Sequence, residues 1–440
     1  MGGSARAAAL EALERSRRDG AWSAMALDAA ITGCGLDRRD AALASRLYLG
    51  VLQNDLYLDH YIDLYLTGKA DRLQPKLRDI LRIGAYQILL LDKIPVRAAV
   101  SESVALCRSQ GLERAAGLVN AVLRRLAENR KTLPPLPGEG STEYLSLRYS
   151  HPLWLARRLT EEQGYDTAER FFRANNDTAP LTIQLNTLSV DAESYRRALQ
   201  RAGLSFTQWP DEPDCFSLPG GNVTELPGYE EGLFYVQDRA AHLAVTAAEP
   251  QEGMQVLDAC AAPGGKSFAC AIAMSGKGRL LSCDIHEKKL RLIRSGAERL
   301  GIRCIETVQK DARSYDPALD GRFDLVLADV PCSGLGVIRK RPEIRRKSEA
   351  ELAGLPQIQE AILDNVSRYV KPGGLLLYST CTVLRAENAE RIEAFLRTHP
   401  AFRLEAMRLG GRVIEEGSYQ FWPQTDETDG FYAAKLRRDG

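Results

Sequence analysis

The strongest constraint on the fold is a change of hydrophobic pattern along the chain. In residues 1–130, apolar residues recur every three or four positions, in one helix-like segment after another. From about residue 236, short continuous apolar runs alternate with helix-like segments instead. Such runs are typical of strands buried on both faces of a parallel sheet. The four clearest runs are MQVLDAC, RLLSCDI, FDLVLADV and GLLLYSTC.

This pattern predicts a multidomain chain. Residues 1–130 are expected to form an all-α domain, and residues 236–440 a doubly wound, Rossmann-like α/β domain. Residues 131–142 (KTLPPLPGEGST) have the composition of a linker, and residues 143–235 mix helical and strand patterns as a small α/β connector.

Composition excludes several classes of protein. The 58 Lys and Arg residues balance 58 Asp and Glu residues, which argues against a globally basic nucleic-acid binder. Nine cysteines include no Cys-x-x-Cys pair and the five histidines are scattered, so we expect no metal site and a reducing, cytoplasmic location. No segment approaches the roughly 20 apolar residues of a membrane helix, and no secretory signal opens the chain, so no membrane partner is expected.

A glycine loop follows the first predicted strand, which ends at Asp258. A phosphate-binding P-loop would need glycine where Cys260 stands, and the Gly-x-Gly-x-x-Gly of a dinucleotide site is absent. S-adenosylmethionine is the third candidate, because it needs a glycine loop and carboxylates at the next strand ends. Asp284 and Asp311 occupy those ends, although each could simply cap a helix. The loop comprises Cys260, Ala261, Ala262, Pro263, Gly264, Gly265 and Lys266.

Two of the nine cysteines lie at the ends of neighbouring predicted strands. Cys332 follows Asp329 in ADVPCSG, and Cys381 lies in YSTCT. A thiol beside S-adenosylmethionine suits methylation of a pyrimidine at C5, because a thiolate adding at C6 makes C5 nucleophilic. Asp329 could hydrogen-bond the N3/N4 edge of a cytosine and favour this attack.

With its glycine loop and its two cysteines at neighbouring strand ends, the sequence resembles a known family, the RNA cytosine-C5 methyltransferases with two active-site cysteines. The resemblance implies a class I methyltransferase fold for residues 236–440. It also implies that Cys381 is the nucleophile, that Cys332 assists product release, and that Asp329 orients the base close to Lys266. The glycine loop, Asp284 and Asp311 would hold S-adenosylmethionine, with Asp329 bordering the pocket. The matching stretches are LDACAAPGGKS, SCDIHEKKLRLI, KDARSYD, ADVPCSGLGVIRKRPEIRRK, GGLLLYSTCTVLRAENAE and TDGFYAAKL.

The N-terminal helices carry a second resemblance. VRAAVSESVALCRSQGLERAAGLVNAVLRRL is similar to the final helices of the NusB-type RNA-binding fold. That fold ahead of this catalytic domain is the arrangement of the bacterial 16S rRNA cytosine-C5 methyltransferases of the Sun (or Fmu) type. The resemblance implies 16S rRNA as the partner, naked or within a small-subunit assembly intermediate, and a monomeric enzyme.

Two local features bear on RNA contact. The run RKRPEIRRK, residues 339–347, carries six cationic residues and one Glu, and its place after the Cys332 loop predicts pairing with RNA phosphates. Gln184 stands where the family usually carries Arg, so we do not assign RNA binding to that position.

Two alternatives remain open at this stage. The chain could be a non-catalytic RNA-binding assembly or transcription factor with a vestigial methyltransferase fold, although the intact cysteine pair argues against this. An ATPase would require the phosphate-cradling turn that Cys260 disrupts.

Overall fold

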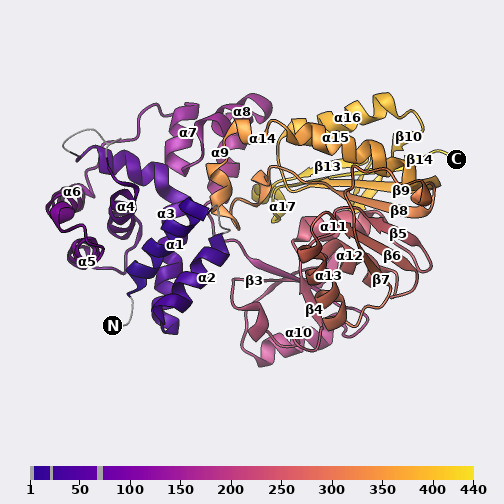
Figure 1. The fold of residues 1–440 in the computed structure, drawn as a ribbon, viewed down its shortest axis with the longest axis horizontal. Helices are drawn as coiled ribbons and strands as arrows, with labels where there is room; N and C mark the ends of the chain where they lie inside the picture. Colours follow the sequence, from indigo (N-terminus) through magenta and orange to yellow (C-terminus); the bar gives the residue numbers. More distant parts are fainter. Residues whose placement is uncertain (1–3, 20–22, 67–72) are drawn as a thin grey trace. The chain divides into compact units, whose positions relative to one another are not determined.

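The N-terminal part of the chain is helical, as its periodicity predicts. The computed structural model describes residues 4–19, 23–66 and 73–440, which form two compact units (Figure 1). The first unit comprises Met1–Asn176 and Ile338–Glu349, and the second comprises Asp177–Val337 and Ala350–Gly440. The helices of the first unit are α1 (Ala5–Asp19), α2 (Ser23–Cys34), α3 (Arg38–Asp63), α4 (Pro75–Leu90), α5 (Val96–Ser109), α6 (Ala116–Asn129), α7 (Thr142–Tyr149), α8 (Leu153–Gln163) and α9 (Tyr165–Ala174).

The apolar faces of α1–α6 meet in one core, in which Leu47, Ile80 and Leu123 are completely buried. The residues predicted to form a linker are irregular in structure, but Leu133 and Leu136 pack against this core. The compact units group elements by packing, so α7–α9 lie in the first unit while the strands that follow lie in the second. The boundaries at residues 130, 142 and 235 stay predictions.

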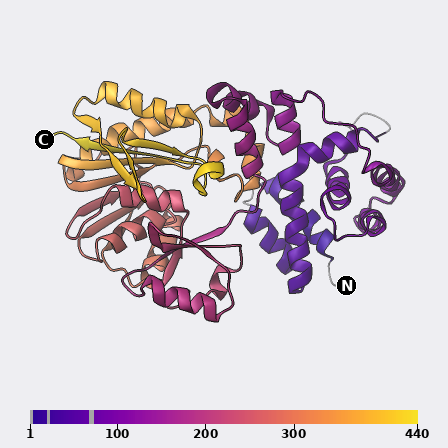
Figure 2. The same ribbon diagram turned by 180° about the vertical axis from the view of Figure 1, so that it is seen from behind.

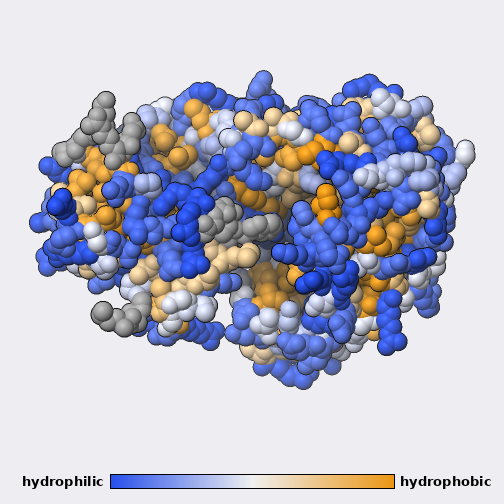
Figure 3. All heavy atoms as spheres, viewed as in Figure 1, coloured by the Kyte–Doolittle hydropathy of each residue, from blue (hydrophilic) through white to orange (hydrophobic). Residues whose placement is uncertain are grey.

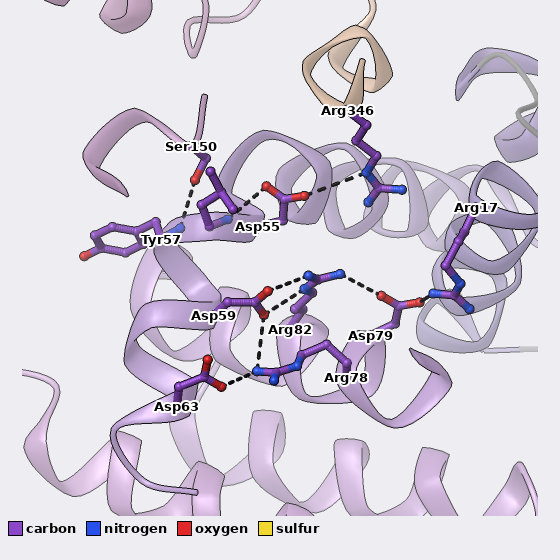
Figure 4. Close-up of polar contacts among 11 residues, drawn as sticks. Arg17, Asp55, Tyr57, Asp59, Asp63, Arg78, Asp79, Arg82, Ser150 and Arg346 are labelled. Carbon is purple, nitrogen blue, oxygen red and sulfur yellow. Dashed lines mark hydrogen bonds and ion pairs between the residues drawn. The ribbon is translucent and has the colours of Figure 1, made fainter. Parts of the chain in front are cut away.

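A chain of ion pairs joins α1, α3 and α4 (Figure 4). The Arg82 guanidinium contacts Asp59 at 2.5 Å and Asp79 at 3.1 Å, and Asp79 is also paired with Arg17. Arg78 lies 3.6 Å from Asp59 and extends the chain of contacts to Asp63 at the end of α3. Because the Asp79 side chain is only 1% exposed, its two cations compensate a charge that burial would otherwise make costly.

Helix α3 is interrupted at Asn54, which has φ −133° and ψ 19°. A break of this kind releases backbone groups from the helical hydrogen-bond ladder. The amide of Tyr57 donates to the Ser150 hydroxyl at 3.0 Å (Figure 4), and the carbonyl of Gln53 accepts from Arg345 at 2.6 Å. The break in α3 is therefore stabilised by residues far away in the sequence.

The prediction that the basic run 339–347 pairs with RNA phosphates does not hold for Arg345. Its side chain is buried in the first unit, and its guanidinium donates to the carbonyl oxygens of Tyr149 and Asn175, which end α7 and begin the turn after α9. Together with Gln53, three helix ends therefore present carbonyl oxygens to one cation, which suits the negative end of each helix dipole. Burial lowers the pKa of Arg345 to about 9. Arg346 lies 3.8 Å from the Asp55 carboxylate (Figure 4). Arg345 is thus an internal structural residue and does not face RNA.

The second unit contains a small antiparallel sheet of order β2-β3-β1-β4, packed on helix α10 (Ala192–Arg201). Gln184 lies in β1 and is completely buried, and its Nε2 donates to Cys215 Sγ at 3.2 Å. This position is therefore inside the unit, consistent with leaving it out of the RNA-binding set. The strands are β1 (Leu181–Leu185), β2 (Thr207–Trp209), β3 (Glu212–Leu218) and β4 (Phe234–Val236).

The four predicted strands form the centre of a larger sheet. Its order is β10-β14-β9-β8-β5-β6-β7, with β13 paired to β14. Neighbours from β9 through β8, β5 and β6 to β7 are parallel, as predicted. The strands are β5 (Gln255–Asp258), β6 (Arg279–Asp284), β7 (Ile305–Gln309), β8 (Phe323–Asp329), β9 (Val370–Thr380), β10 (Phe402–Leu404), β13 (Ser418–Phe421) and β14 (Phe431–Arg438).

The sheet as a whole is mixed, because antiparallel strands extend the predicted parallel part on the β9 side. Strand β14 is antiparallel to β9 and to β10, and β13 is antiparallel to β14. Figure 2 shows the molecule from behind, with the C-terminal strands in yellow. The helices α11 (Arg239–Ala247), α12 (Gly265–Ala273) and α13 (Glu287–Arg299) cover one face, and α15 (Leu355–Val366) and α16 (Ala389–Thr398) cover the other. Because both faces are buried, the ligand-accessible part of the sheet is its edge.

Hydrophilic residues dominate the surface view in Figure 3. Among the described residues, no helix is both long enough and apolar enough to cross a membrane. That same part of the chain holds no cluster of three or more His, Cys, Asp or Glu side chains arranged to bind a metal ion.

Candidate active site

The glycine loop connects the end of β5 to the start of α12. Gly264 has φ +115°, and a Cβ there would lie 2.7 Å from the ring of Phe268, so the position requires glycine. Helix α12 begins at the next residue, Gly265, which brings the first unpaired amides of the helix to the loop. The backbone of the loop is tied to β6 through a 2.7 Å bond from the Ala261 amide to the Cys283 carbonyl.

Asp258 supports the loop from inside. It is completely buried, and its Oδ2 accepts from the Ser267 hydroxyl, which lies 2.8 Å from that of Ser282. Burial raises the pKa of Asp258 to about 7, and the charge of Asp329 adds to this effect. Its Oδ1 has no hydrogen-bond partner among the described residues. From the sequence, Asp258 is predicted only to end the first strand.

The two predicted cofactor carboxylates lie at adjacent strand ends, because β6 and β7 are parallel neighbours. Asp284 is 8% exposed, and its Oδ1 accepts from the His286 amide at 2.9 Å, which fixes the turn before α13. Asp311 is paired with Arg313 at 2.7 Å, and this hydrogen bond lowers the pKa of Asp311. Neither aspartate is the N-cap of a helix, because His286 precedes α13 and a turn follows Asp311. Each accepts one local backbone hydrogen bond and lies at the ligand-accessible edge.

Lys266 and Asp329 form an ion pair at this edge. The Lys266 Nζ lies 2.7 Å from Asp329 Oδ2 and 5.0 Å from the centre of the Phe431 ring. Burial alone would lower the pKa of Lys266, but the Asp329 carboxylate reverses this and raises it, so the lysine stays charged. Asp329 Oδ1 accepts from Ser379 at 2.9 Å, and its side chain remains 31% exposed.

The two cysteines predicted to lie at neighbouring strand ends are in contact. Strands β8 and β9 are parallel neighbours with Asp329 opposite Ser379, so the turns that follow them lie side by side. The sulfur atoms of Cys332 and Cys381 are 3.2 Å apart. The shared hydrogen bond with Cys381, then burial and the nearby negative charges, raise the pKa of Cys332 well above its usual value. The Cys332 thiol is therefore protonated at neutral pH.

The structure also adds residues that sequence reasoning missed. Phe431 supplies a ring face to Lys266 from β14, a strand that the sequence pattern did not predict. Glu387 and Gln359 lie buried beneath the turn that carries Cys332. Their sequence signal is weak, because an acidic residue and a glutamine in helix-like segments usually face solvent.

Comparisons with known proteins place this geometry in a family. Residues 245–437 match the family described as 16S rRNA methyltransferase RsmB/F, residues 3–128 match the NusB family, and residues 151–224 match the ferredoxin-like domain of RsmF/B-like methyltransferases. The probable ribosomal RNA small subunit methyltransferase B of Bacillus subtilis is 34% identical over 446 residues, covering 99% of both chains. The chain belongs to the RsmB/F family of 16S rRNA methyltransferases.

Other relatives agree with this assignment. Ribosomal RNA small subunit methyltransferase B of Serratia proteamaculans is 33% identical over 90% of both chains. The crystal structure of PH0851 superposes with a TM-score of 0.83 at 27% identity, covering 99% of this chain and 98% of that one. NSun6 from Pyrococcus horikoshii, solved with SFG, shares the fold at 21% identity and a TM-score of 0.58, over 66% of this chain and 98% of that one.

As an RsmB/F member, the chain is an rRNA methyltransferase with a NusB-type helical domain, and its cofactor is S-adenosylmethionine. The family resemblance found in the sequence is thereby confirmed. The donor set at the sheet edge fits this cofactor. The amides at the start of α12 suit a carboxylate, and the carboxylates of Asp284 and Asp311 suit hydroxyl and amino groups.

Proposed function

We propose that this chain methylates C5 of a cytosine in 16S rRNA, through a covalent bond between Cys381 Sγ and C6 of the base. The observation that carries this proposal is the 3.2 Å separation of the Cys381 and Cys332 sulfur atoms beside the Lys266–Asp329 pair. A methyltransferase that acts on oxygen or on an exocyclic nitrogen has no need of a thiol nucleophile, whereas C5 of a pyrimidine does.

Cys381 is the better nucleophile of the pair. The pKa of Cys332 is raised, so Cys332 stays protonated and can donate its hydrogen bond to the Cys381 sulfur. The electrostatic interaction of Cys381 with Lys266 raises the pKa of Lys266, which means that the ammonium stabilises negative charge on Cys381. Addition of the Cys381 thiolate to C6 moves an electron pair toward C5 and N3 of the cytosine.

Asp329 and Lys266 are suited to bind the base. The partly exposed Asp329 carboxylate can accept a hydrogen bond from the N4 amino group of cytosine, and Lys266 holds that carboxylate in place. When bound, S-adenosylmethionine supplies the electrophilic methyl group that C5 attacks. We assign its binding to the glycine loop from Cys260 to Lys266, to Asp284 and to Asp311, with Asp329 at the border.

Release of the product requires two bonds to break. The C5 proton passes to water, the C6–S bond breaks, and its electron pair returns to Cys381 as the C5–C6 double bond of the base re-forms. Cys332 holds its proton within hydrogen-bond distance of Cys381 and stabilises the departing thiolate. Because RNA bases are accessible to such chemistry only when unstacked, the target is a loop or single-stranded cytosine.

The test is an alanine variant of the proposed nucleophile. Cys381→Ala should abolish transfer of a labelled methyl group to 16S rRNA, while cofactor binding measured by calorimetry stays unchanged. Undiminished transfer by Cys381→Ala would contradict the proposal.

We further propose that the enzyme acts as a monomer in the cytoplasm, on naked 16S rRNA or an assembly intermediate. Sedimentation of the purified chain with and without rRNA tests the oligomeric state.

A further inference from the structure

Glu387 is a buried carboxylate that the proposed chemistry does not use. It ends the short 3-10 turn Arg385–Glu387, between β9 and α16, and its side chain is almost fully buried at 2% exposed. A carboxylate in such a place is costly unless hydrogen bonds or cations compensate its charge. Its surroundings therefore indicate what it does.

One oxygen of Glu387 holds the turn around Cys332 from both sides. Oε2 accepts from the amide of Ser333 at 2.9 Å, directly after Cys332. It also accepts from Gln359 Nε2 at 2.8 Å, and the same Nε2 donates to the carbonyl of Pro331 at 3.0 Å, directly before Cys332. The backbone on either side of the cysteine is thus fixed to one carboxylate.

The same turn is also tied to the turn that carries Cys381. The hydroxyls of Ser333 and Thr382 lie 2.6 Å apart, which joins the residues that follow the two cysteines. The amide of Gly336 donates to the carbonyl of Cys381 at 3.0 Å. With the backbone held at these points, the distance between the sulfur atoms is set by the protein rather than by substrate.

The charge of Glu387 acts on the same thiol. Its other oxygen, Oε1, is buried without a hydrogen-bond partner among the described residues. The negative charges that face Cys332 come from Cys381, from Glu387 and from Asp329, and all three raise the pKa of the Cys332 thiol. Lys266, which lies at this edge, is paired with Asp329 and so offsets that carboxylate rather than Glu387.

We propose that Glu387 is a positioning residue for the methyl-transfer reaction, which fixes the Cys332 turn against Cys381 and keeps the shared proton on Cys332. This inference rests on the proposed function, in which Cys381 is the nucleophile and Cys332 keeps its proton. Glu387 touches neither reacting atom. It acts through the backbone of Ser333 and through its buried charge, so that Cys381 is the thiol free to ionise.

The variants separate these two effects. Glu387→Gln keeps an acceptor oxygen for Ser333 and Gln359 but removes the charge. Glu387→Ala removes both the charge and the hydrogen bonds. Glu390→Gln is the matched control, because Glu390 is an exposed residue three positions further along the chain.

The first readout is the alkylation rate of each cysteine by iodoacetamide in the RNA-free full chain, followed by mass spectrometry across a pH series. Glu387→Gln should shift the Cys332 profile to lower pH and raise its rate at fixed pH by roughly 3- to 10-fold, since one pKa unit is tenfold in thiolate. Glu390→Gln should match the parent. An unchanged Cys332 profile in Glu387→Gln overturns the proposed effect of charge.

The second readout is the single-turnover rate of methyl transfer at saturating cofactor and rRNA. Glu387→Ala should lower this rate, and Glu387→Gln should recover most of the loss because it restores the bonds to Ser333 and Gln359. Equal rates in Glu387→Ala and the parent overturn the positioning role. The alkylation experiment needs no methyl transfer, so it stands even where Cys381→Ala has disproved the proposed function.

Discussion

Carboxylates are paired with cations to different extents in two regions of the molecule. In the helical unit, Asp79 and Asp59 each meet two guanidinium groups, from the set Arg17, Arg78 and Arg82. Their contacts join three helices, and the Asp79 side chain is almost completely buried. Each charge here is matched by its neighbours, as in a network that stabilises a fold.

At the edge of the catalytic sheet, the carboxylates are less completely matched. Asp329 meets one cation, Lys266, and stays partly exposed. Asp258 and Glu387 each bury one oxygen that has no hydrogen-bond partner within the described part of the chain. Buried carboxylates that are incompletely paired are typical of functional sites. The contrast teaches that the pairing of a carboxylate, more than its burial, distinguishes the helical network from the proposed active site.

The largest expected effect is at Asp329. Asp329→Asn keeps the shape of the side chain but removes the charge that binds the base and holds Lys266. We expect the turnover of methyl transfer to fall by roughly 10²- to 10⁴-fold, the usual range for a positioned acid or base. The stability to urea should change little. Turnover that stays within about threefold of the parent would remove Asp329 from the reaction.

The second effect tests the helical network. Asp79→Ala leaves the guanidinium groups of Arg17 and Arg82 without their buried partner. The free energy of unfolding should fall by about 3–5 kcal/mol, as when one member of a buried pair is removed. Glu113→Gln, in an exposed pair with Arg108, is the control and should leave stability unchanged. Urea unfolding of the full chain measures both, and equal stability of the two variants would break the comparison.

The third effect concerns the pH dependence of stability. Folding raises the pKa of Asp258 from 3.8 to about 7, so the folded state holds its proton more tightly. The stability from this group is fully present below pH 3.8 and is lost as pH rises through about 7. Between pH 5 and pH 8 this amounts to about 2–3 kcal/mol. In Asp258→Asn, the decrease in stability from pH 5 to pH 8 should be smaller by that amount. An identical decrease in both proteins would contradict the assignment.

The smallest effect is at Arg345. A lysine there keeps the positive charge near the helix ends but cannot reach the carbonyls of Gln53, Tyr149 and Asn175 together. Arg345→Lys should lower the free energy of unfolding by about 1–2 kcal/mol. Arg345→Lys should also leave the salt dependence of rRNA binding unchanged, because this guanidinium makes no phosphate contact. A weaker salt dependence would restore the RNA-binding interpretation of the residue.

Much of the fold followed from the sequence because buried parallel strands have continuous apolar runs. The ends of β5, β6, β8 and β9 were predicted in this way, and with them Asp258, Asp284, Asp329 and the cysteine pair. Strands β10 and β13 escaped prediction because they are short. Strand β14 lies inside the sheet, between β10 and β9, and escaped because its sequence FYAAKLRR mixes aromatic, small and cationic residues instead of forming a continuous apolar run.

The burial of two residues could not be predicted, because it depends on contacts with distant parts of the sequence. Arg345 lies in a strongly cationic run, and nothing local shows that three helix ends will enclose it. Glu387 lies in a segment that resembles the exposed start of a helix, yet the turn after β8 folds over it. In both cases the partners are far away in the sequence, so composition predicts the usual solvent-facing side chain instead.

The most direct test of the account is a search for the covalent intermediate. The Cys332→Ala variant, incubated with 16S rRNA and S-adenosylmethionine, should accumulate a protein–RNA adduct that survives denaturing electrophoresis. The double variant Cys332→Ala/Cys381→Ala should form none. An adduct that persists without Cys381 would contradict a reaction through the Cys381 sulfur, and the absence of an adduct in Cys332→Ala while methylation continues would remove the release role of Cys332.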